Sequence, residues 1–533
     1  MEYLPCFPRN PIIDAAAALG IKPIVSRQER VGMGIADGFS RVSNGRPPGV
    51  FAMQFGPGAE NAFSGVATAY SDSVPVLVLP MGHVRARAGI LPHFNSVRSF
   101  RSVAKSVEEI NTGDRVVHVM RRAFSSLKTG RPGPVMVEVP LDVATEEVDE
   151  SAIAYQPVKP ALATADPRDV DEAARVLVEA RNPVIQAGQG VLYAGATEEL
   201  QQLAELLQVP VMTTIAGKSA FPEAHPLSLG TGAATITGPV VHFVSRADVV
   251  FGIGTSFTRH GMTSTVPPRK TLIQATNDPA DINKDYSVDH PIIGDARLVL
   301  GQLIEAVKDR LGGKARDGAA VAQEIGEVRE KWMEEWMPKL TSDEVPINPY
   351  RVVWELMRTV HPAEAIVTHD SGSPRDQMVP FYRAAGPRSF LGWGKSHGLG
   401  TGLGLAIGAK LAAPEKLAVY WLGDAAFGMV GLDFETSVRS GLPILTLVSN
   451  NSTMAGETEA MPVSQECYGS RDLGGNYADM TRAMGGYAER VEAPSQVGPA
   501  IQRARRATEE GRAALVEFIT CEETASSHRR AFG

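Results

Sequence analysis

The chain has 533 residues, of which 44% are hydrophobic and 21% are charged. This composition is typical of a folded globular protein, and the length exceeds what one core usually supports, so we expect about three domains. The formal net charge of −8 argues against a nucleic-acid partner. No apolar run approaches the ~20 residues needed to cross a membrane, so no membrane partner is expected either.

The cysteines are too few and too far apart to form a framework. Cys6, Cys467 and Cys521 are odd in number, and their spacing fits neither a zinc site nor a set of disulfides. Free thiols of this kind are typical of a reducing compartment. We therefore expect a cytoplasmic protein, and its composition favours an enzyme.

Apolar runs alternate with helix-like stretches along residues 1–150, the first predicted domain. Two of the runs cover 49–53 and 74–79. The block closes with a β-branched run at 134–140, which is bounded by prolines and typical of a buried parallel strand. A polar linker is expected near 146–167.

Two further blocks, 168–310 and 345–525, continue this alternation, and a charged helical bridge over 314–339 is expected between them. The first and third blocks are similar in size but share no obvious repeated motif. Alternation of strands with helices predicts an α/β fold of three doubly wound parallel-sheet domains. The expected strands cover 183–187, 249–254 and 271–275 in the second block, and 365–368, 417–422, 444–448 and 514–519 in the third.

The segment from Gly423 to Thr453 carries the strongest functional signal. Asp424 directly follows the expected strand 417–422, a helix is expected over 431–440, and the strand 444–448 leads to Asn451. Parallel pairing puts Asp424 and Asn451 at the carboxyl ends of neighbouring strands, the edge at which open α/β sheets bind ligands.

The residue types at this edge favour a divalent cation. Mg²⁺ prefers carboxylate, amide and carbonyl oxygens and takes its remaining ligands from phosphates and water. The small Ala425 and Ala426 leave a helix N-terminus open to an anion. Taken singly, Asp424 could be a helix cap and the asparagines a turn. The joint pattern favours a magnesium–diphosphate cradle.

Asn451 follows Asp424 by 27 residues, and this spacing after Gly-Asp resembles the signature of thiamine diphosphate-dependent enzymes. Within them the chain is similar to the group of acetolactate synthases, pyruvate oxidases and 2-oxo acid decarboxylases. The resemblance implies an N-terminal pyrimidine-binding domain, a central domain and a C-terminal diphosphate-binding domain. It also implies that Asp424, Asn451 and the Thr453 carbonyl ligate the metal. The residues it places beside the diphosphate are Gly423, Ala425, Ala426 and Met454.

Residues 26–41 resemble the segment that carries the cofactor-activating glutamate of the family, here Glu29. A carboxyl group bonded to the aminopyrimidine ring stabilises the tautomer that takes the thiazolium proton, so Glu29 is expected to be catalytic, buried and raised in pKa. The alternative is a surface salt bridge with Arg27 or Arg30. The apolar residues before Glu29 and the Gly/Ala-rich run after it favour burial.

Three more segments match the family. Gly58 and Asn61 lie in a Gly-Pro-Gly-Ala-Glu-Asn turn that resembles the one beside the aminopyrimidine. Leu399 aligns with the apolar side chain beneath the two cofactor rings, although its glycine-rich surroundings could equally reflect tight helix packing. Ser371, Gly372 and Ser373 follow the strand 365–368, where relatives hold the diphosphate.

Histidines supply the remaining candidates for acid–base chemistry. His93 falls near the family position of a substrate-facing Gln or His and is expected to be catalytic, with a plain loop histidine as the alternative. His397, closer to Leu399, is a second candidate. We expect His83 to be structural.

Some features depart from acetolactate synthases. The N-terminus begins at what looks like the end of the first strand, so either the start codon is placed too late or the first helix is missing. Arg9 and Asn10 replace an expected Gly-Gly pair, and the residues after Thr453 lack that enzyme's substrate-pocket motif. The middle block lacks its flavin-contact pattern, which leaves FAD as an unsupported alternative to thiamine diphosphate and Mg²⁺ alone.

The expected reaction is therefore acetolactate synthase-like carboligation of a 2-oxo acid with an aldehyde or second 2-oxo acid, with simple decarboxylation as the next choice. A 2-hydroxyacyl-CoA or oxalyl-CoA lyase is the alternative within the family, and a non-catalytic regulatory paralogue is the alternative outside catalysis. The resemblance also implies a homodimer or homotetramer in which Glu29 of one subunit meets Asp424 of another.

Overall fold

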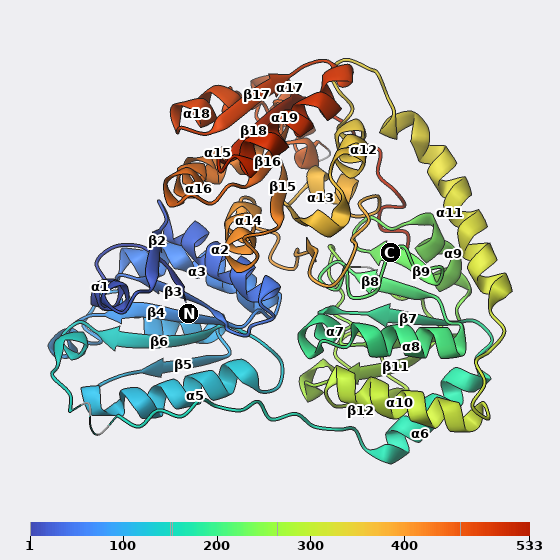
Figure 1. Ribbon diagram of the computed structural model, residues 1–533, viewed down its shortest axis with the longest axis horizontal. Helices are drawn as coiled ribbons and strands as arrows, with labels where there is room; N and C mark the ends of the chain where they lie inside the picture. The colour runs from blue at the N-terminus through green and yellow to red at the C-terminus, as the bar shows by residue number, and fades with distance from the viewer. Residues whose placement is uncertain (1, 150, 152, 264, 459, 533) are drawn as a thin grey trace.

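The computed structural model describes residues 2–149, 151, 153–263, 265–458 and 460–532. Its strands form three six-stranded parallel sheets with helices packed between and around them, which confirms the predicted α/β class. Figure 1 shows the three units side by side, with the N-terminal unit blue, the central unit green and the C-terminal unit orange to red. No described helix is long and apolar enough to span a bilayer.

The first sheet has the strand order β2-β1-β3-β4-β6-β5. Its strands β3 and β4 are buried along their whole length, as expected of parallel strands covered on both faces. The strands are β1 (Tyr3–Cys6), β2 (Lys22–Val25), β3 (Gly49–Met53), β4 (Val76–Gly82), β5 (Ser106–Glu109) and β6 (Val135–Pro140). The helices are α1 (Pro11–Ala18), α2 (Glu29–Val42), α3 (Pro57–Ser71), α4 (Ser96–Ser99) and α5 (Val116–Lys128).

The central sheet has the order β12-β11-β10-β7-β8-β9, the doubly wound order of dinucleotide-binding folds, and its order reverses between β7 and β10. Its strands are β7 (Pro183–Ala187), β8 (Val211–Thr214), β9 (Ser228–Gly232), β10 (Val249–Ile253), β11 (Thr271–Thr276) and β12 (His290–Ile293). Its helices are α6 (Pro167–Glu179), α7 (Gln189–Ala194), α8 (Thr197–Leu207), α9 (Gly238–Arg246) and α10 (Ala296–Arg310).

The third sheet has the order β14-β13-β15-β16-β18-β17. This is the same strand order as in the first sheet, a similarity that no sequence motif indicated. Its strands are β13 (Ala365–His369), β14 (Phe390–Leu391), β15 (Leu417–Gly423), β16 (Leu445–Asn450), β17 (Tyr487–Val491) and β18 (Ala514–Ile519). Its helices are α12 (Pro349–Thr359), α13 (Ser373–Met378), α14 (Thr401–Ala412), α15 (Asp424–Val430), α16 (Phe434–Ser440), α17 (Pro462–Tyr468), α18 (Tyr477–Ala483) and α19 (Val497–Glu509).

The connections between the units follow the expected pattern with two differences. Residues 153–166 carry no helix or strand, in keeping with a linker, whereas the bridging helix α11 (Ala319–Leu340) starts later than predicted. The helix expected over 431–440 was also wrong at its start, because α15 begins at Asp424 and a short 3₁₀ turn separates it from α16. The domain limits 1–150, 168–310 and 345–525 stay a prediction.

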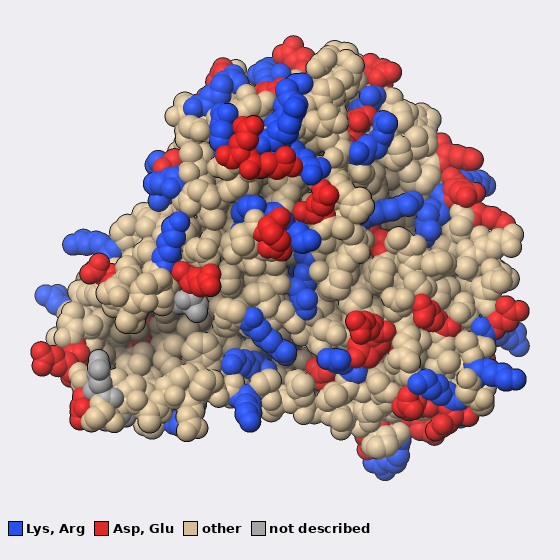
Figure 2. All heavy atoms as spheres, viewed as in Figure 1, with Lys and Arg blue, Asp and Glu red and all other residues tan. Residues whose placement is uncertain are grey.

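The first and third units meet where α2 packs against α14. The two backbones approach so closely that a Cβ at Gly404 would lie 2.7 Å from the Gly34 Cα atom, and one at Gly408 would lie 2.1 Å from the Ile35 carbonyl oxygen. Only glycine fits such a contact. The glycine-rich run after Leu399 is therefore explained by helix packing, the plainer of its two interpretations. On the face in Figure 2, basic and acidic side chains are interspersed over all three units.

Candidate active site

Asp424 and Asn451 follow two neighbouring strands of the third sheet. Strands β15 and β16 pair in parallel, with Gly423 opposite Ser449, so the residues after both strands emerge at the same edge. Asp424 is only 3% exposed. This juxtaposition is what parallel pairing of the two predicted strands requires.

The Asp424 carboxyl has unused capacity for a ligand. Its Oδ1 accepts a hydrogen bond from the Ala425 amide at 2.9 Å, whereas its Oδ2 is enclosed and has no partner among the described residues. Burial raises the pKa of Asp424 to about 6, and the backbone amides of Ala425, Ser452 and Thr453 oppose that rise. A buried carboxylate oxygen without a donor is costly unless a cation meets it, so this group fits a divalent metal.

The turn after β16 brings the other two expected ligands beside it. Asn451 Oδ1 accepts from the Thr453 amide at 3.2 Å, and the Thr453 carbonyl accepts from the Ala455 amide at 3.0 Å. The turn interpretation is thus correct for the local backbone, but a carbonyl oxygen has two lone pairs and one is left for a metal. Asn450 has a different task, since it is buried and donates to Glu517 at 2.7 Å.

Asp370 is a buried residue of the site that the sequence analysis did not single out. It follows β13, is fully buried, and accepts hydrogen bonds from the amides of Ser371 (2.8 Å), Gly400 (2.8 Å) and Gly402 (3.0 Å). The Tyr420 hydroxyl donates to it at 2.5 Å. Its place directly after a buried strand is the same signal that identified Asp424.

Through these bonds, Asp370 joins two of the expected cofactor segments. Ser371, Gly372 and Ser373 form the turn into α13, and Gly372 adopts the positive φ of 85° that favours glycine. Leu399 lies on the other segment, is half-buried and packs against the apolar core of the third sheet. The two segments border the point between β13 and β15 where the strand order of the sheet reverses.

Glu29 begins α2 and is 3% exposed. Its Oε2 accepts a hydrogen bond from Asn61 Nδ2 at 3.3 Å, and a Cβ at Gly58 would lie 3.3 Å from its Oε1. Burial raises the pKa of Glu29, with the Asn61 bond opposing. The alternative of a surface salt bridge with Arg27 or Arg30 is wrong, because among the described residues no ion pair includes Glu29, and Arg27 pairs with Glu435 at 2.9 Å.

The structure places His83 and His93 together above this region. Their rings lie 4.5 Å apart between centroids, and the His83 ring lies 4.7 Å from that of Phe55, in the turn that leads to Gly58. His93 is exposed, whereas His83 Nε2 is enclosed and has no partner among the described residues. Burial and the neighbouring His93 lower the pKa of His83. His83 thus belongs to the same histidine pair as the predicted catalytic residue.

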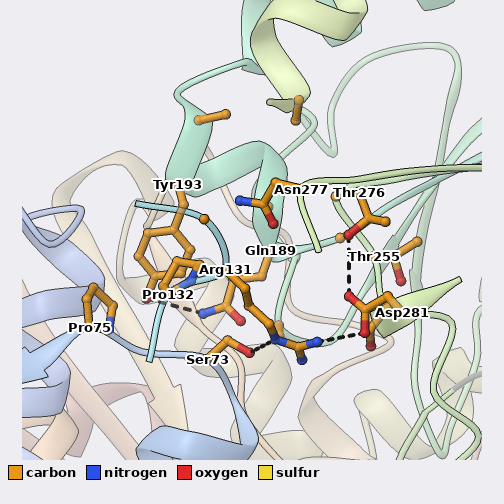
Figure 3. Close-up of a pocket in the computed structure, with 18 of the residues that line it drawn as sticks. Ser73, Pro75, Arg131, Pro132, Gln189, Tyr193, Thr255, Thr276, Asn277 and Asp281 are labelled. Atoms are coloured by element: carbon orange, nitrogen blue, oxygen red, sulfur yellow. Dashed lines mark hydrogen bonds and ion pairs between the residues drawn. The ribbon is translucent and has the colours of Figure 1, made fainter. Parts of the chain in front are cut away.

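A cavity of about 850 Å³ lies at the carboxyl edge of the central sheet. Gly188 and Gly254, which directly follow the paired strands β7 and β10, belong to its lining, and its far wall comes from the first unit. Figure 3 shows Arg131 crossing it, with a hydrogen bond to Ser73 Oγ at 2.8 Å and an ion pair with Asp281 at 2.6 Å. Sequence reasoning missed this cavity, because segments of three units line it.

The first and third units share one strand order, and the central unit between them in the chain has the dinucleotide-binding order. The first unit holds the buried acid Glu29, and the third holds Asp424, a buried carboxylate that fits a divalent metal. This arrangement is typical of enzymes that bind an organic cofactor at the edges of parallel sheets. Family models for thiamine pyrophosphate enzymes match residues 3–102 (N-terminal TPP binding domain), 170–303 (central domain) and 370–518 (C-terminal TPP binding domain). The chain belongs to this family of thiamine pyrophosphate (diphosphate) enzymes, as predicted.

Relatives span most of the chain. A probable acetolactate synthase large subunit of Methanocaldococcus jannaschii is 33% identical and covers 83% of this chain and 76% of its own length. A sulfoacetaldehyde acetyltransferase of Alcaligenes xylosoxydans is 28% identical over 97% of this chain and 89% of its own. The crystal structure of benzoylformate decarboxylase from Polynucleobacter necessarius aligns with a TM-score of 0.83 over 99% of this chain and 97% of its own, at 20% identity, and so shares the fold.

Proposed function

We propose that the enzyme uses thiamine diphosphate and Mg²⁺ to form or break a carbon–carbon bond next to the carbonyl of a 2-oxo acid, and that the reaction is acetolactate synthase-like carboligation. Simple decarboxylation is the next choice. The observation that carries the proposal is the buried Oδ2 of Asp424, which has no partner in the part of the chain that the structure describes and lies beside the 451–453 turn. The acetolactate synthase large subunits among the relatives support the choice of reaction. A cytoplasmic location belongs to the same proposal.

The residues of the third unit hold the metal and the diphosphate. Asp424, the Asn451 side chain and the Thr453 carbonyl bind Mg²⁺, whose other ligands are phosphate oxygens and water. Small side chains leave room for the diphosphate itself. The residues that line it are Gly423, Ala425, Ala426, Met454, Ser371, Gly372 and Ser373.

The residues of the first unit work on protons. When bound, thiamine diphosphate supplies the carbon nucleophile and the electron sink that this chemistry requires. Glu29 holds a proton at the aminopyrimidine ring, a task for which a raised carboxyl pKa is suited. Gly58 and Asn61 position that ring and the Glu29 carboxyl, Leu399 supports the cofactor from below, and His93 exchanges protons with the substrate carbonyl.

The two halves of the site are assigned to different subunits of a homodimer or homotetramer. Among the described residues, no hydrogen bond joins Glu29 or Asn61 to Asp424 or Asn451. Large apolar side chains are exposed on or next to helices of both units: Tyr70, in the last turn of α3, is 46% exposed, and Leu432, two residues after α15, is 61% exposed. Burial of such side chains in an isologous interface supports subunits that share their sites.

Cofactor titration followed by product analysis tests the proposal. We expect thiamine diphosphate to bind only with Mg²⁺, as followed by circular dichroism, and a panel of 2-oxo acids and aldehydes to give coupled or decarboxylated products by mass spectrometry. Glu29→Gln should lose roughly 10²–10⁴-fold in kcat while keeping the cofactor. Glu109→Gln, an exposed carboxyl on β5 of the same unit, is the matched control. Cofactor binding without turnover of any substrate favours the regulatory paralogue instead.

The cavity of the central unit favours a second candidate, a lyase that acts on 2-hydroxyacyl-CoA or oxalyl-CoA. About 850 Å³ at the reversal point of a doubly wound sheet suits a nucleotide-bearing ligand. FAD is another nucleotide-bearing ligand that suits a cavity of about 850 Å³, and its binding would not require a role in catalysis. Absorbance of the purified protein at 450 nm reports FAD, and turnover of the acyl-CoA panel reports the lyase. An enzyme that is flavin-free and indifferent to CoA esters excludes both.

A further inference from the structure

A cluster of basic side chains lies where the central unit touches the cofactor segment of the third unit. His260 comes from the loop after β10, and His397 from the loop before α14, two residues from Leu399. Their rings lie 5.6 Å apart between centroids. Lys395 lies on the same loop as His397, and its Nζ donates to Ser256 Oγ on the central loop at 3.4 Å. Three groups that carry or accept protons therefore converge from two units.

No carboxylate compensates these groups at close range. Among the described residues, no Asp or Glu oxygen lies within 4 Å of the side-chain nitrogens of His260, His397 or Lys395. The remaining bonds of the two histidines go to backbone: His260 Nδ1 accepts from the Met262 amide at 3.2 Å, and His397 Nδ1 lies 3.3 Å from the Lys395 carbonyl oxygen. No hydrogen bond within the described part of the chain reaches their second ring nitrogens, which leaves these atoms available to a ligand.

The more distant charges around the cluster are mixed. Around His260, besides His397 and Lys395, stand Arg375, which is paired with Asp376, and Asp72, which is paired with Arg41. Around Lys395 stand Asp72, Asp281, Arg131 and Lys284, most of them already in ion pairs with one another. Burial lowers the pKa of both His260 and Lys395, and the neighbouring cations add to this for each. An anion arriving here meets basic groups that have no close counter-charge.

The position of the cluster connects it with the reaction. Lys395 and Met262 line the cavity of the central unit, and Leu399, four residues after Lys395, belongs to the expected cofactor site. His397 also has a backbone φ of 40°, a left-handed conformation that glycine adopts most easily. The chain therefore carries a histidine side chain at a position where glycine would be less strained. The cluster thus adjoins the cavity through Lys395 and lies on the same loop as the expected cofactor residue Leu399.

We propose that His260, His397 and Lys395 form a subsite for an anionic end group of the substrate, a carboxylate, sulfonate or phosphonate remote from the reacting carbonyl. The inference rests on the proposed function for the identity of the reaction and narrows its substrate class to 2-oxo acids or aldehydes with a second acidic group. Lys395 provides an ammonium group on a flexible tether, and histidine ring N–H groups add hydrogen bonds to the anion.

Unreactive probes of one size test the subsite directly. Ethanesulfonate, ethylphosphonate, propionate and uncharged propan-1-ol are titrated calorimetrically into the enzyme loaded with cofactor and Mg²⁺. We expect the three anions to bind and the alcohol not to bind, and the anion that binds most tightly identifies the preferred acidic group. Equal behaviour of the alcohol and the anions overturns the proposal.

Variants locate the binding. Lys395→Met and His397→Asn should each lower the affinity for the preferred anion by about tenfold, which is the effect expected from the loss of one charged hydrogen bond. Asn is chosen at 397 because it tolerates a positive φ. Ser396→Ala, between the two, is the matched control and should bind as wild type does. If Lys395→Met and His397→Asn leave anion binding as unchanged as the control does, the assignment is overturned, because the anion then binds elsewhere.

Kinetics separate this proposal from the proposed function. With a turned-over substrate in its charged and uncharged forms, Lys395→Met should raise KM for the charged form about tenfold and leave kcat and the cofactor affinity unchanged. Anion binding at these residues in a protein that turns over no 2-oxo acid refutes the proposed function and keeps the subsite. Turnover without discrimination between the two forms refutes the subsite alone.

Discussion

The carboxylate of Asp370 accepts a hydrogen bond from the Gly400 amide at 2.8 Å, across 30 residues of sequence. The same carboxylate accepts from the Ser371 amide, so one buried group ties the turn that enters α13 to the segment that bears Leu399. Both segments are expected to touch the cofactor, one at the diphosphate and the other beneath the rings. This buried side chain at the reversal point of the sheet therefore helps to fix their relative position.

Replacing Asp370 by Asn should weaken cofactor binding. The amide keeps the shape of the side chain but loses the charge, and its NH₂ group cannot accept from an amide. Loss of one charged hydrogen bond costs about 1.5–3 kcal/mol, so thiamine diphosphate affinity should fall at least about tenfold in a calorimetric titration. Asp248→Asn is the control, since Asp248 also accepts two backbone amides but in the central unit. Equal losses in both variants would mean general destabilisation.

Metal binding at Asp424 should depend on pH. Burial raises the pKa of this carboxyl from 3.8 to about 6, so the folded apoprotein holds the proton more tightly than the unfolded chain. The carboxyl therefore lowers apoprotein stability as pH rises from about 4 to about 6. Mg²⁺ needs the ionised form, so Mg²⁺-dependent cofactor affinity should drop about tenfold between pH 7 and pH 5.

Calorimetry in two buffers of different ionisation enthalpy measures the proton released when Mg²⁺ and cofactor bind at pH 5.5. Asp424→Asn should bind the cofactor poorly and release no such proton. Asp479→Asn, an exposed carboxyl on α18, should behave as wild type does. A pH-independent affinity in the wild type would show that Asp424 is not a metal ligand.

Much of the fold was predictable because its signals are local. Buried parallel strands appear as β-branched runs between glycines and prolines, and the unit from β15 to β16 could be recognised from the joint pattern of its two strands, Asp424 and Asn451. The start of α15 was missed because Gly428 and Gly431 make its sequence look like a loop. The kinship of the first and third sheets was also missed, because a shared strand order leaves no residue pattern.

The parts of the site that could not be predicted depend on contacts distant in sequence. Asp370 acts on the amides of Gly400 and Gly402, whose approach is fixed by α14 rather than by spacing. His83 was expected to be structural, but its ring lies against His93, and that contact needs the loop after β4 to fold back on itself. The large cavity exists only once three units are assembled, so no single segment contains its signal.

The close approach of α2 and α14 should make Gly404 intolerant of any side chain. A Cβ there would lie 2.7 Å from the Gly34 Cα atom, and backbone cannot move aside as a side chain does. We expect Gly404→Ala to lower the free energy of unfolding by about 1–3 kcal/mol in urea titrations. Gly326→Ala in α11, where a Cβ meets nothing within 4 Å, should instead be neutral or stabilising. If Gly404→Ala were as stable as the wild type, α2 and α14 would have to lie further apart than the 2.7 Å between the added Cβ and the Gly34 Cα atom implies.

Two inactive variants should restore activity when their subunits are mixed. If Glu29 of one subunit works with Asp424 of another, a heterodimer of Glu29→Gln and Asp424→Ala contains one site with both native residues and one with neither. Random exchange makes about half of the dimers mixed, so the mixture should regain about a quarter of wild-type activity. Mixing is done after mild dissociation, and sedimentation velocity checks that dimers re-form. Each variant mixed with itself is the control. If each site instead uses both residues of a single chain, every site in the mixture keeps one defect and no activity returns.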